Sequence, residues 1–182
     1  MIVFFISDLN VGAIWLTRHG ESEFNLENRI GGDPALTPLG RKYALAMSKF
    51  IQERHPFSEE DTENQFSILT STLRRTIESV AYFDPLKYNI QHIRSLNEIY
   101  AGSCETLSYE KAGELYPTEF ANRAKNKLLT RFPGPGGECY ADVIERLQPV
   151  IVELERMELD TLLVTHQAVM VRNVYITNSG PC

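Results

Sequence analysis

The sequence predicts a three-layer α/β/α fold, in which helices cover both faces of a mostly parallel sheet. Three short apolar runs, at 11–16, 66–70 and 161–165, are the expected buried strands. Between them, the segments 38–54 and 140–156 have apolar residues at helical spacing. Strands that alternate with helices in this order are typical of α/β domains built on a parallel sheet.

The composition narrows the functional classes. The chain has 182 residues, of which 43% are hydrophobic, enough for one domain with a substantial core. The formal net charge is −6, whereas proteins that bind nucleic acids or membrane surfaces carry basic faces. The three cysteines are widely spaced and form no Cys-x-x-Cys pair, so they indicate neither a disulfide framework nor a zinc site. We expect no metal, no cofactor, no nucleic-acid partner and no membrane association.

The chain begins with six apolar residues, Met1 to Ile6. They lack a basic start and are soon followed by Asp8, so they match neither a signal peptide nor a membrane-spanning helix. The expected location is therefore cytoplasmic.

Charged and imidazole side chains follow each expected strand. Arg18 and His19 follow the first strand, Arg74 and Arg75 lie where a helix opens after the second, and His166 follows the third. The carboxyl ends of parallel strands meet at one edge of a sheet, where open α/β folds bind ligands. A helix N-terminus also attracts anions. This arrangement predicts a phosphate-binding site.

Glu98 lies between two apolar residues, Leu96 and Ile99. Partial burial would remove water from its carboxyl group and raise the pKa, which would make Glu98 a usable proton donor. The alternative interpretation is a solvated surface charge.

A basic pair follows the next helical segment, which spans 108–116 and stops at Pro117. Arg123 and Lys127 are four residues apart, a spacing that places both cations on one face if this segment is helical. The alternative interpretation is a solvated basic surface.

The stretch Arg18-His19-Gly20-Glu21-Ser22-Glu23-Phe24-Asn25, followed by Arg29-Ile30-Gly31-Gly32-Asp33, resembles the opening of the histidine phosphatase superfamily. The Ile-Gly-Gly-Asp variant and the segment 145–156 resemble its fructose-2,6-bisphosphatase branch. This resemblance implies a phosphoglycerate-mutase-like fold and metal-independent hydrolysis of fructose 2,6-bisphosphate. It makes His19 the nucleophile and Glu98 the proton donor, with Arg18, Arg75 and a protonated His166 holding the phosphate.

The same resemblance implies which residues bind the sugar bisphosphate. These are Asn25, Gly31, Tyr109, Arg123, Lys127, Tyr140 and Gln167. The turn-rich loop 133–137 is about two residues longer than is usual in the family and bears on the position of Tyr140. In bifunctional members an apolar stretch joins an upstream kinase domain to the phosphatase. We therefore interpret residues 1–12 as an apolar N-terminal segment or interdomain join, and 13–182 as the phosphatase domain.

The chain departs from the family pattern after Met170. Relatives have an arginine at the position of Val171, so that arginine is either missing or displaced to Arg172, and the C-terminal elements are expected to be incomplete. Two alternatives follow. One is a phosphoglycerate mutase or broad sugar-phosphate phosphatase of the same superfamily, and the other is a truncated non-catalytic remnant that only binds sugar phosphate.

Overall fold

The core of the protein is a five-stranded sheet with the strand order β1-β2-β5-β3-β4, here in a computed structural model that describes residues 3–6, 12–56 and 66–170. Strands β2 (Ile14–Arg18), β5 (Thr161–Thr165), β3 (Ser67–Thr70) and β4 (Asn89–His92) are parallel. Strand β1 (Val3–Ile6) pairs with β2 in the antiparallel direction and forms one edge. The mostly parallel sheet is confirmed.

Part of the apolar N-terminal segment therefore belongs to the sheet as β1. The rest of that segment, at 1–2 and 7–11, lies outside the described residues, as do Val171, Arg172 and the expected incomplete C-terminal elements.

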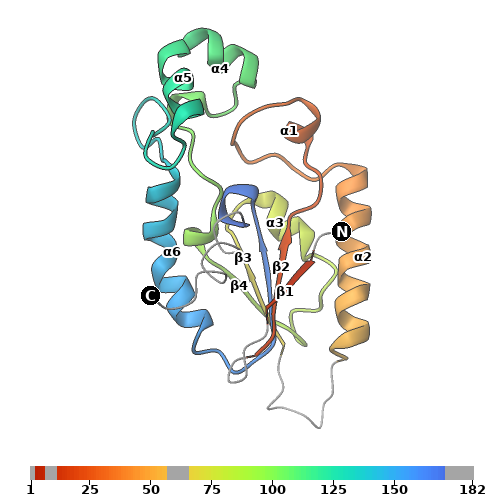
Figure 1. Cartoon of the computed structure of the whole chain (residues 1–182). Coiled ribbons are helices and arrows are strands. Elements are labelled where there is room, and N and C mark those ends of the chain that lie inside the picture. The colour runs from red at the N-terminus through yellow and green to blue at the C-terminus, as the bar shows by residue number, and fades with distance from the viewer. Residues whose placement is uncertain (1–2, 7–11, 57–65, 171–182) are drawn as a thin grey trace.

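Side chains alternate between the two faces of the sheet. On one face Leu16, Leu69 and Leu163 pack in a cluster with apolar residues of helix α6 (Tyr140–Leu154). On the other face Ile68, Leu162 and Val164 pack with residues of helix α2 (Pro38–Arg54). Figure 1 shows the sheet between α6 and α2. This confirms the three-layer prediction.

Local sequence signals set the helix boundaries. Thr37 precedes α2 as its N-cap, and its side-chain oxygen accepts a hydrogen bond from the backbone N–H of Gly40 at 3.0 Å. Pro38 occupies the first helical position, where the missing N–H removes no helical hydrogen bond. Helix α4 (Tyr109–Leu115) begins after Ser108, which caps it in the same way. The remaining short elements are α1 (Glu23–Leu26), α3 (Arg74–Ser79), α5 (Pro117–Lys125), and the 3₁₀ turns η1 (Arg94–Leu96) and η2 (Gly102–Cys104).

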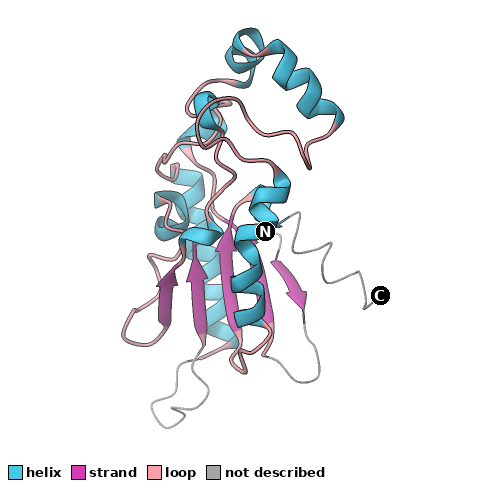
Figure 2. Cartoon of the chain, turned by 90° about the vertical axis from the view of Figure 1, so that its left-hand side faces the viewer, coloured by secondary structure: helices cyan, strands magenta, loops and turns pink. Residues whose placement is uncertain are grey.

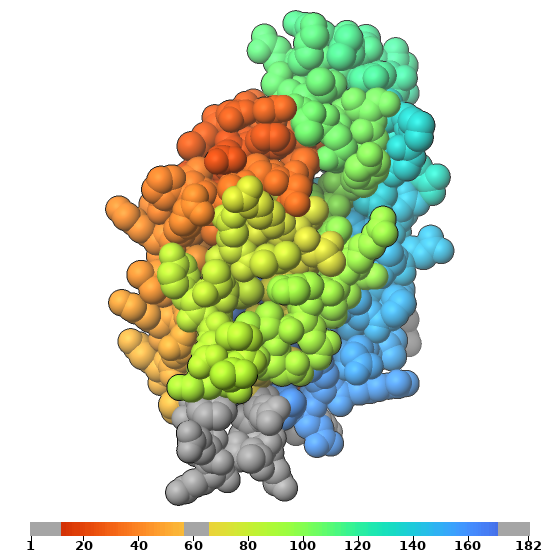
Figure 3. Space-filling view, turned by 180° about the vertical axis from the view of Figure 1, so that it is seen from behind, coloured from red at the N-terminus to blue at the C-terminus, as the bar shows by residue number. Residues whose placement is uncertain are grey.

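Helices α4 and α5 stand above the carboxyl edge of the sheet, opposite α1 (Figures 1 and 2). A separate apolar cluster, which includes Ile30, Cys104, Ala112 and Phe132, supports this upper part. Seen from behind, the segment from α3 to η1 forms the surface between α2 and α6 (Figure 3). Among the described residues, no helix combines the length and apolarity needed to cross a bilayer.

The long loop at 133–137 is fixed by hydrogen bonds to the segment that contains η2. The backbone N–H of Ser103 donates to the carbonyl of Pro133 at 2.8 Å, and the N–H of Glu138 donates to the carbonyl of Tyr100 at 2.9 Å. Gly134 has φ +86°, and a Cβ there would lie 1.9 Å from the Ser103 hydroxyl. The loop is thus anchored on both sides just before Tyr140, which begins α6.

Candidate active site

The polar residues that follow β2, β3 and β5 meet at the carboxyl edge of the sheet. Arg18 at the end of β2 is in register with Thr165 at the end of β5, and the N–H of His19 donates to the carbonyl of Thr165 at 3.0 Å. The ring centroids of His19 and His166 are 5.1 Å apart. The predicted convergence of these strand ends is present.

The hydrogen bonds of His19 define its reactive nitrogen. Its Nδ1 lies 2.6 Å from the carbonyl oxygen of Gly20, which only accepts hydrogen bonds, so Nδ1 carries the proton. Nε2 accepts a hydrogen bond from Nε of Arg75 at 3.2 Å. Burial, together with the positive charges of Arg75 and Arg18, lowers the pKa of His19 to about 3. His19 is therefore a neutral imidazole whose Nε2 lone pair is available for attack.

Two arginines flank this imidazole. Arg75 is 4% exposed, and its Nη1 donates to the carbonyl of Gly32 at 2.9 Å. Burial lowers the pKa of Arg75, while the carboxylates of Glu98 and Asp33 oppose the effect. Arg18 is exposed and lines the same cavity. The site thus combines one buried, hydrogen-bonded guanidinium with one exposed guanidinium.

His166 is fully buried beside His19. Its Nε2 forms a hydrogen bond with the hydroxyl of Ser71 at 2.7 Å, whereas its Nδ1 has no hydrogen-bond partner among the described residues. Burial, with help from the charge of Arg75, lowers its pKa well below the ordinary value. Burial therefore favours the neutral imidazole, and protonation of His166 around a bound phosphate stays a prediction. Its desolvation outweighs any stabilisation of the imidazolium by its surroundings.

Glu98 is half-buried in the segment between η1 and η2. Its Oε1 accepts hydrogen bonds from the backbone N–H of Ile99 at 2.9 Å and of Ala168 at 3.2 Å. Desolvation raises the pKa of Glu98, although these bonds and Arg75 act in the opposite direction. A carboxyl group with a raised pKa that shares a cavity with a neutral imidazole is suited to proton donation.

A single cavity of about 570 Å³ connects these groups. Every predicted site residue lines it except the fully buried His166. The residues concerned are Arg18, His19, Asn25, Gly31, Arg75, Glu98, Tyr109, Arg123, Lys127, Tyr140 and Gln167. Across the described chain, no group of three or more His, Cys, Asp or Glu side chains is arranged to hold a metal ion.

The outer part of the cavity carries the basic pair. Arg123 is only 8% exposed, its guanidinium lies 3.7 Å from the centroid of the Phe132 ring, and its Nη1 donates to the carbonyl of Thr130 at 2.6 Å. The prediction that Arg123 and Lys127 share one helix face is wrong, because α5 ends at Lys125. Lys127 lies in the following turn, where its carbonyl accepts from the N–H of Tyr140 at 3.3 Å. Arg123 from α5 and Lys127 from the turn nevertheless line the same cavity.

The loop after β2 supplies neutral polar groups to the cavity. Oδ1 of Asn25 accepts from the N–H of Ser22 at 2.9 Å, which leaves the amide NH₂ of Asn25 for a ligand. Gly31 has φ +61°, and a Cβ there would lie 2.2 Å from a carboxylate oxygen of Glu105. That carboxylate accepts from the N–H of Gly32 at 2.5 Å. The positive φ of Gly31 therefore favours glycine here, and a larger residue would push the Glu105 carboxylate aside.

Comparison with known proteins identifies the family. The profile of the histidine phosphatase superfamily (branch 1) matches residues 14–174. The chain belongs to this superfamily.

Curated relatives of this superfamily member are longer proteins. Human 6-phosphofructo-2-kinase/fructose-2,6-bisphosphatase 4 is 42% identical over 171 residues, which cover 93% of this chain and 34% of the relative. Saccharomyces cerevisiae 6-phosphofructo-2-kinase 1 is 40% identical over 183 residues, which cover 92% of this chain and 22% of the relative. The chain thus spans about a third or less of these relatives.

The fold of this superfamily member also matches solved structures. Bacillus stearothermophilus YhfR aligns with a TM-score of 0.69 and 25% identity, over 92% of this chain and 84% of that one. This likeness supports the phosphoglycerate-mutase-like architecture expected from the resemblance.

Several residues that organise this histidine phosphatase site were missed in the sequence. Ser71, which bonds His166, directly follows β3 and could have been found from that position. Glu105, which bonds the Gly32 N–H, and the pair Glu138 and Arg146 gave no such signal. The backbone groups of Gly32, Ser95 and Tyr100 that these side chains bind are 73, 51 and 38 residues away in the sequence.

Proposed function

We propose that the chain hydrolyses fructose 2,6-bisphosphate to fructose 6-phosphate and phosphate, without a metal, through a phosphohistidine on His19. One observation carries the proposal. The neutral Nε2 of His19 lies in a cavity with two guanidinium groups and a carboxyl group of raised pKa. Nucleophile, anion-binding groups and proton donor are the parts that phosphoryl transfer requires.

In the first step, Nε2 of His19 attacks phosphorus and the bond to the sugar oxygen breaks. Arg18 and Arg75 stabilise the negative charge on the equatorial phosphoryl oxygens. Protonated Glu98 donates its proton to the departing sugar oxygen, so the sugar leaves as an alcohol. The negative phosphoryl group opposes the lowering of the His166 pKa, and the unpartnered Nδ1 of His166 is available to donate to it.

In the second step, water attacks phosphorus and the bond to Nε2 breaks. Glu98, now a carboxylate, accepts a proton from that water and returns to its starting form. Inorganic phosphate leaves, and His19 is again neutral. The two steps together consume one water and transfer no electrons.

The outer half of the cavity supports a sugar bisphosphate as the substrate. Arg123 and Lys127 provide positive charge for a second phosphate, and Tyr109 and Tyr140 provide hydroxyl groups and ring faces for the sugar. Burial raises the pKa of both tyrosines, so they remain neutral hydrogen-bonding groups. The human relative has fructose-2,6-bisphosphatase in its name, while the yeast relative is named for kinase activity alone. Both names include 6-phosphofructo-2-kinase, which supports the expectation of a kinase domain upstream in a longer chain.

Phosphate release from fructose 2,6-bisphosphate, measured without added metal, tests the proposal. The purified chain is compared with a His19→Ala variant, and 2,3-bisphosphoglycerate is assayed in parallel. Turnover of the sugar bisphosphate alone, lost in the variant, is the expected result. Turnover of both esters favours a mutase or a broad phosphatase instead. A folded chain that turns over neither favours the non-catalytic remnant.

A Glu98→Gln variant separates the two roles of the carboxyl group. The variant cannot protonate a leaving group or activate water, so turnover of the sugar bisphosphate is expected to fall by about 10²–10⁴-fold. With an activated aryl phosphate, labelling quenched in alkali, where the N–P bond is stable, should still detect the phosphohistidine. Complete absence of the phosphoenzyme would contradict the role given to Glu98.

A further inference from the structure

The segment that carries Glu98 has no regular secondary structure of its own. It runs from the end of η1 at Leu96 to the start of η2 at Gly102. The Glu98 carboxyl group itself accepts two hydrogen bonds, both at Oε1. A proton donor must be held within a fraction of an ångström of its productive position, so something else has to fix this segment.

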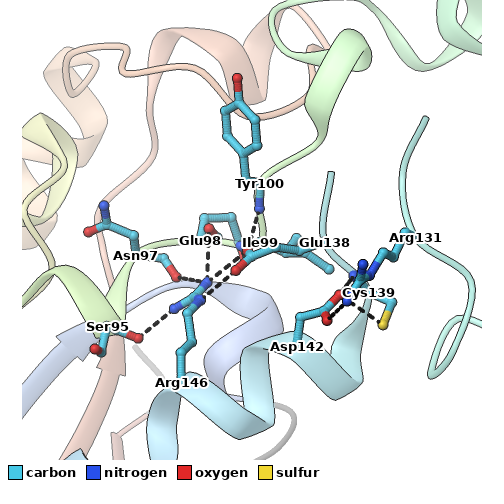
Figure 4. Close-up of polar contacts among 10 residues, drawn as sticks. All are labelled: Ser95, Asn97, Glu98, Ile99, Tyr100, Arg131, Glu138, Cys139, Asp142 and Arg146. Atoms are coloured by element: carbon cyan, nitrogen blue, oxygen red, sulfur yellow. Dashed lines mark hydrogen bonds and ion pairs between the residues drawn. The ribbon is translucent and has the colours of Figure 1, made fainter. Parts of the chain in front are cut away.

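Arg146 of α6 binds the backbone of that segment from below (Figure 4). Its Nη1 donates to the carbonyl of Ser95 at 2.5 Å. Its Nη2 donates to the carbonyls of Asn97 at 2.8 Å and Glu98 at 3.2 Å. One planar guanidinium thus gathers three carbonyl groups around the proposed proton donor, which a lysine ammonium cannot reproduce with the same geometry.

Glu138 completes the arrangement on the other side of Glu98. Its Oε1 accepts from Nε of Arg146 at 2.8 Å, and its Oε2 accepts from Nη2 at 3.1 Å. Oε2 also accepts from the backbone N–H of Tyr100 at 2.8 Å. The side chains of Arg146 and Glu138 are only 22% and 20% exposed, so solvent screens the pair weakly. Together they hold the backbone from Ser95 to Tyr100.

We propose that Arg146 and Glu138 are positioning residues that fix the Glu98 carboxyl group for proton transfer. This inference rests on the proposed role of Glu98 as proton donor. Neither residue lines the substrate cavity, whereas both line a second cavity on the Arg146 side of Glu98. Glu138 also lies two residues before Tyr140, which does line the substrate cavity. The pair therefore connects the proton donor to the substrate-binding segment.

Two aryl phosphates distinguish positioning from a general structural role. Phenyl phosphate releases a poor leaving group that needs a proton, whereas 2,4-dinitrophenyl phosphate releases a stable anion that does not. Rapid-quench measurement of phosphoenzyme formation is made with the full chain, with Arg146→Lys and with Glu138→Gln. Arg131→Lys is the matched control. Arg131 forms an ion pair with Asp142, which lies on α6 as Arg146 does, but this pair does not contact the 95–100 segment (Figure 4).

The expected result is selective. Phosphoenzyme formation from phenyl phosphate should slow by about 10–100-fold in Arg146→Lys and Glu138→Gln, in line with the effect of a small misplacement. Formation from 2,4-dinitrophenyl phosphate should change by less than about twofold, because no proton is transferred in that step. Arg131→Lys should match the unmodified chain with both esters.

Equal slowing with both esters, or no slowing with either, overturns the positioning role. If Arg146→Lys lacks a cooperative thermal transition, Glu138→Gln alone decides the question, because its amide oxygen still accepts from Tyr100. Failure of the proposed function is separately visible, since the unmodified chain would then form no phosphoenzyme from either ester, and the positioning role would fall with it.

Discussion

The charge of His19 can be measured without any substrate, and the structure predicts an unusual result. An ordinary histidine has a pKa near 6.5, so about 3% of it would be neutral at pH 5. With the pKa lowered to about 3, about 99% of His19 stays neutral at that pH. The difference comes first from burial, since the side chain is 6% exposed, and next from the charge of Arg75.

An NMR titration of the histidine Cε1–H resonances between pH 4 and 8 provides the assay, with His19→Gln used to assign the signal. The His19 resonance should show no midpoint in this range. In an Arg75→Gln variant the midpoint should rise, because a positive charge that disfavours the imidazolium has been removed. A midpoint near 6.5 in the unmodified chain would refute the reasoning, since it would mean that His19 is hydrated or paired with an anion.

Three further predictions concern the phosphorylated nitrogen of His19, the pH dependence of stability and the packing of the core. The phosphohistidine should be linked through Nε2, because Nδ1 donates to the carbonyl of Gly20 at 2.6 Å; an Nδ1 linkage in ³¹P NMR of the phosphoenzyme would contradict this. Stability should fall as the pH decreases below about 6.5, because the unfolded chain then binds protons that folded His19 and His166 exclude, with a slope of at most about 1.4 kcal/mol per pH unit for each histidine. Urea denaturation at pH 7 and pH 5 measures the slope, and His19→Gln should reduce it. Leu163→Ala should lower the free energy of unfolding by about 2–5 kcal/mol, because Leu163 is 1% exposed in the α6-facing cluster. Leu86→Ala, at a side chain that is 92% exposed, should change it by less than about 0.5 kcal/mol, and equal losses would count against the assigned core.

The local elements could be predicted because each depends on neighbouring residues. The Thr37-Pro38 start of α2 needs only a capping oxygen and a residue without an N–H, and both are adjacent in the chain. The buried strands β3 and β5 are short apolar runs whose polar ends give their boundaries. Because parallel strands end at one sheet edge, the same pattern also located His19, Arg75 and His166 in one site.

The properties of that site depended on tertiary contacts. Lys127 reaches the cavity although it lies beyond the end of α5, because a turn pairs it with the start of α6. The lowered pKa of His166 follows from its complete burial, which no neighbour in sequence specifies. Arg146 reaches carbonyl groups 48 to 51 residues away.

The sequence by itself therefore determined the order of the strands and helices, and which residue types stand at the strand ends. The tertiary structure alone decided the tautomer of His19, the direction in which the pKa of His166 shifts and the support of Glu98. The physical reason is range: capping and periodicity act within a few residues, whereas desolvation and long-range hydrogen bonds depend on which segments pack together.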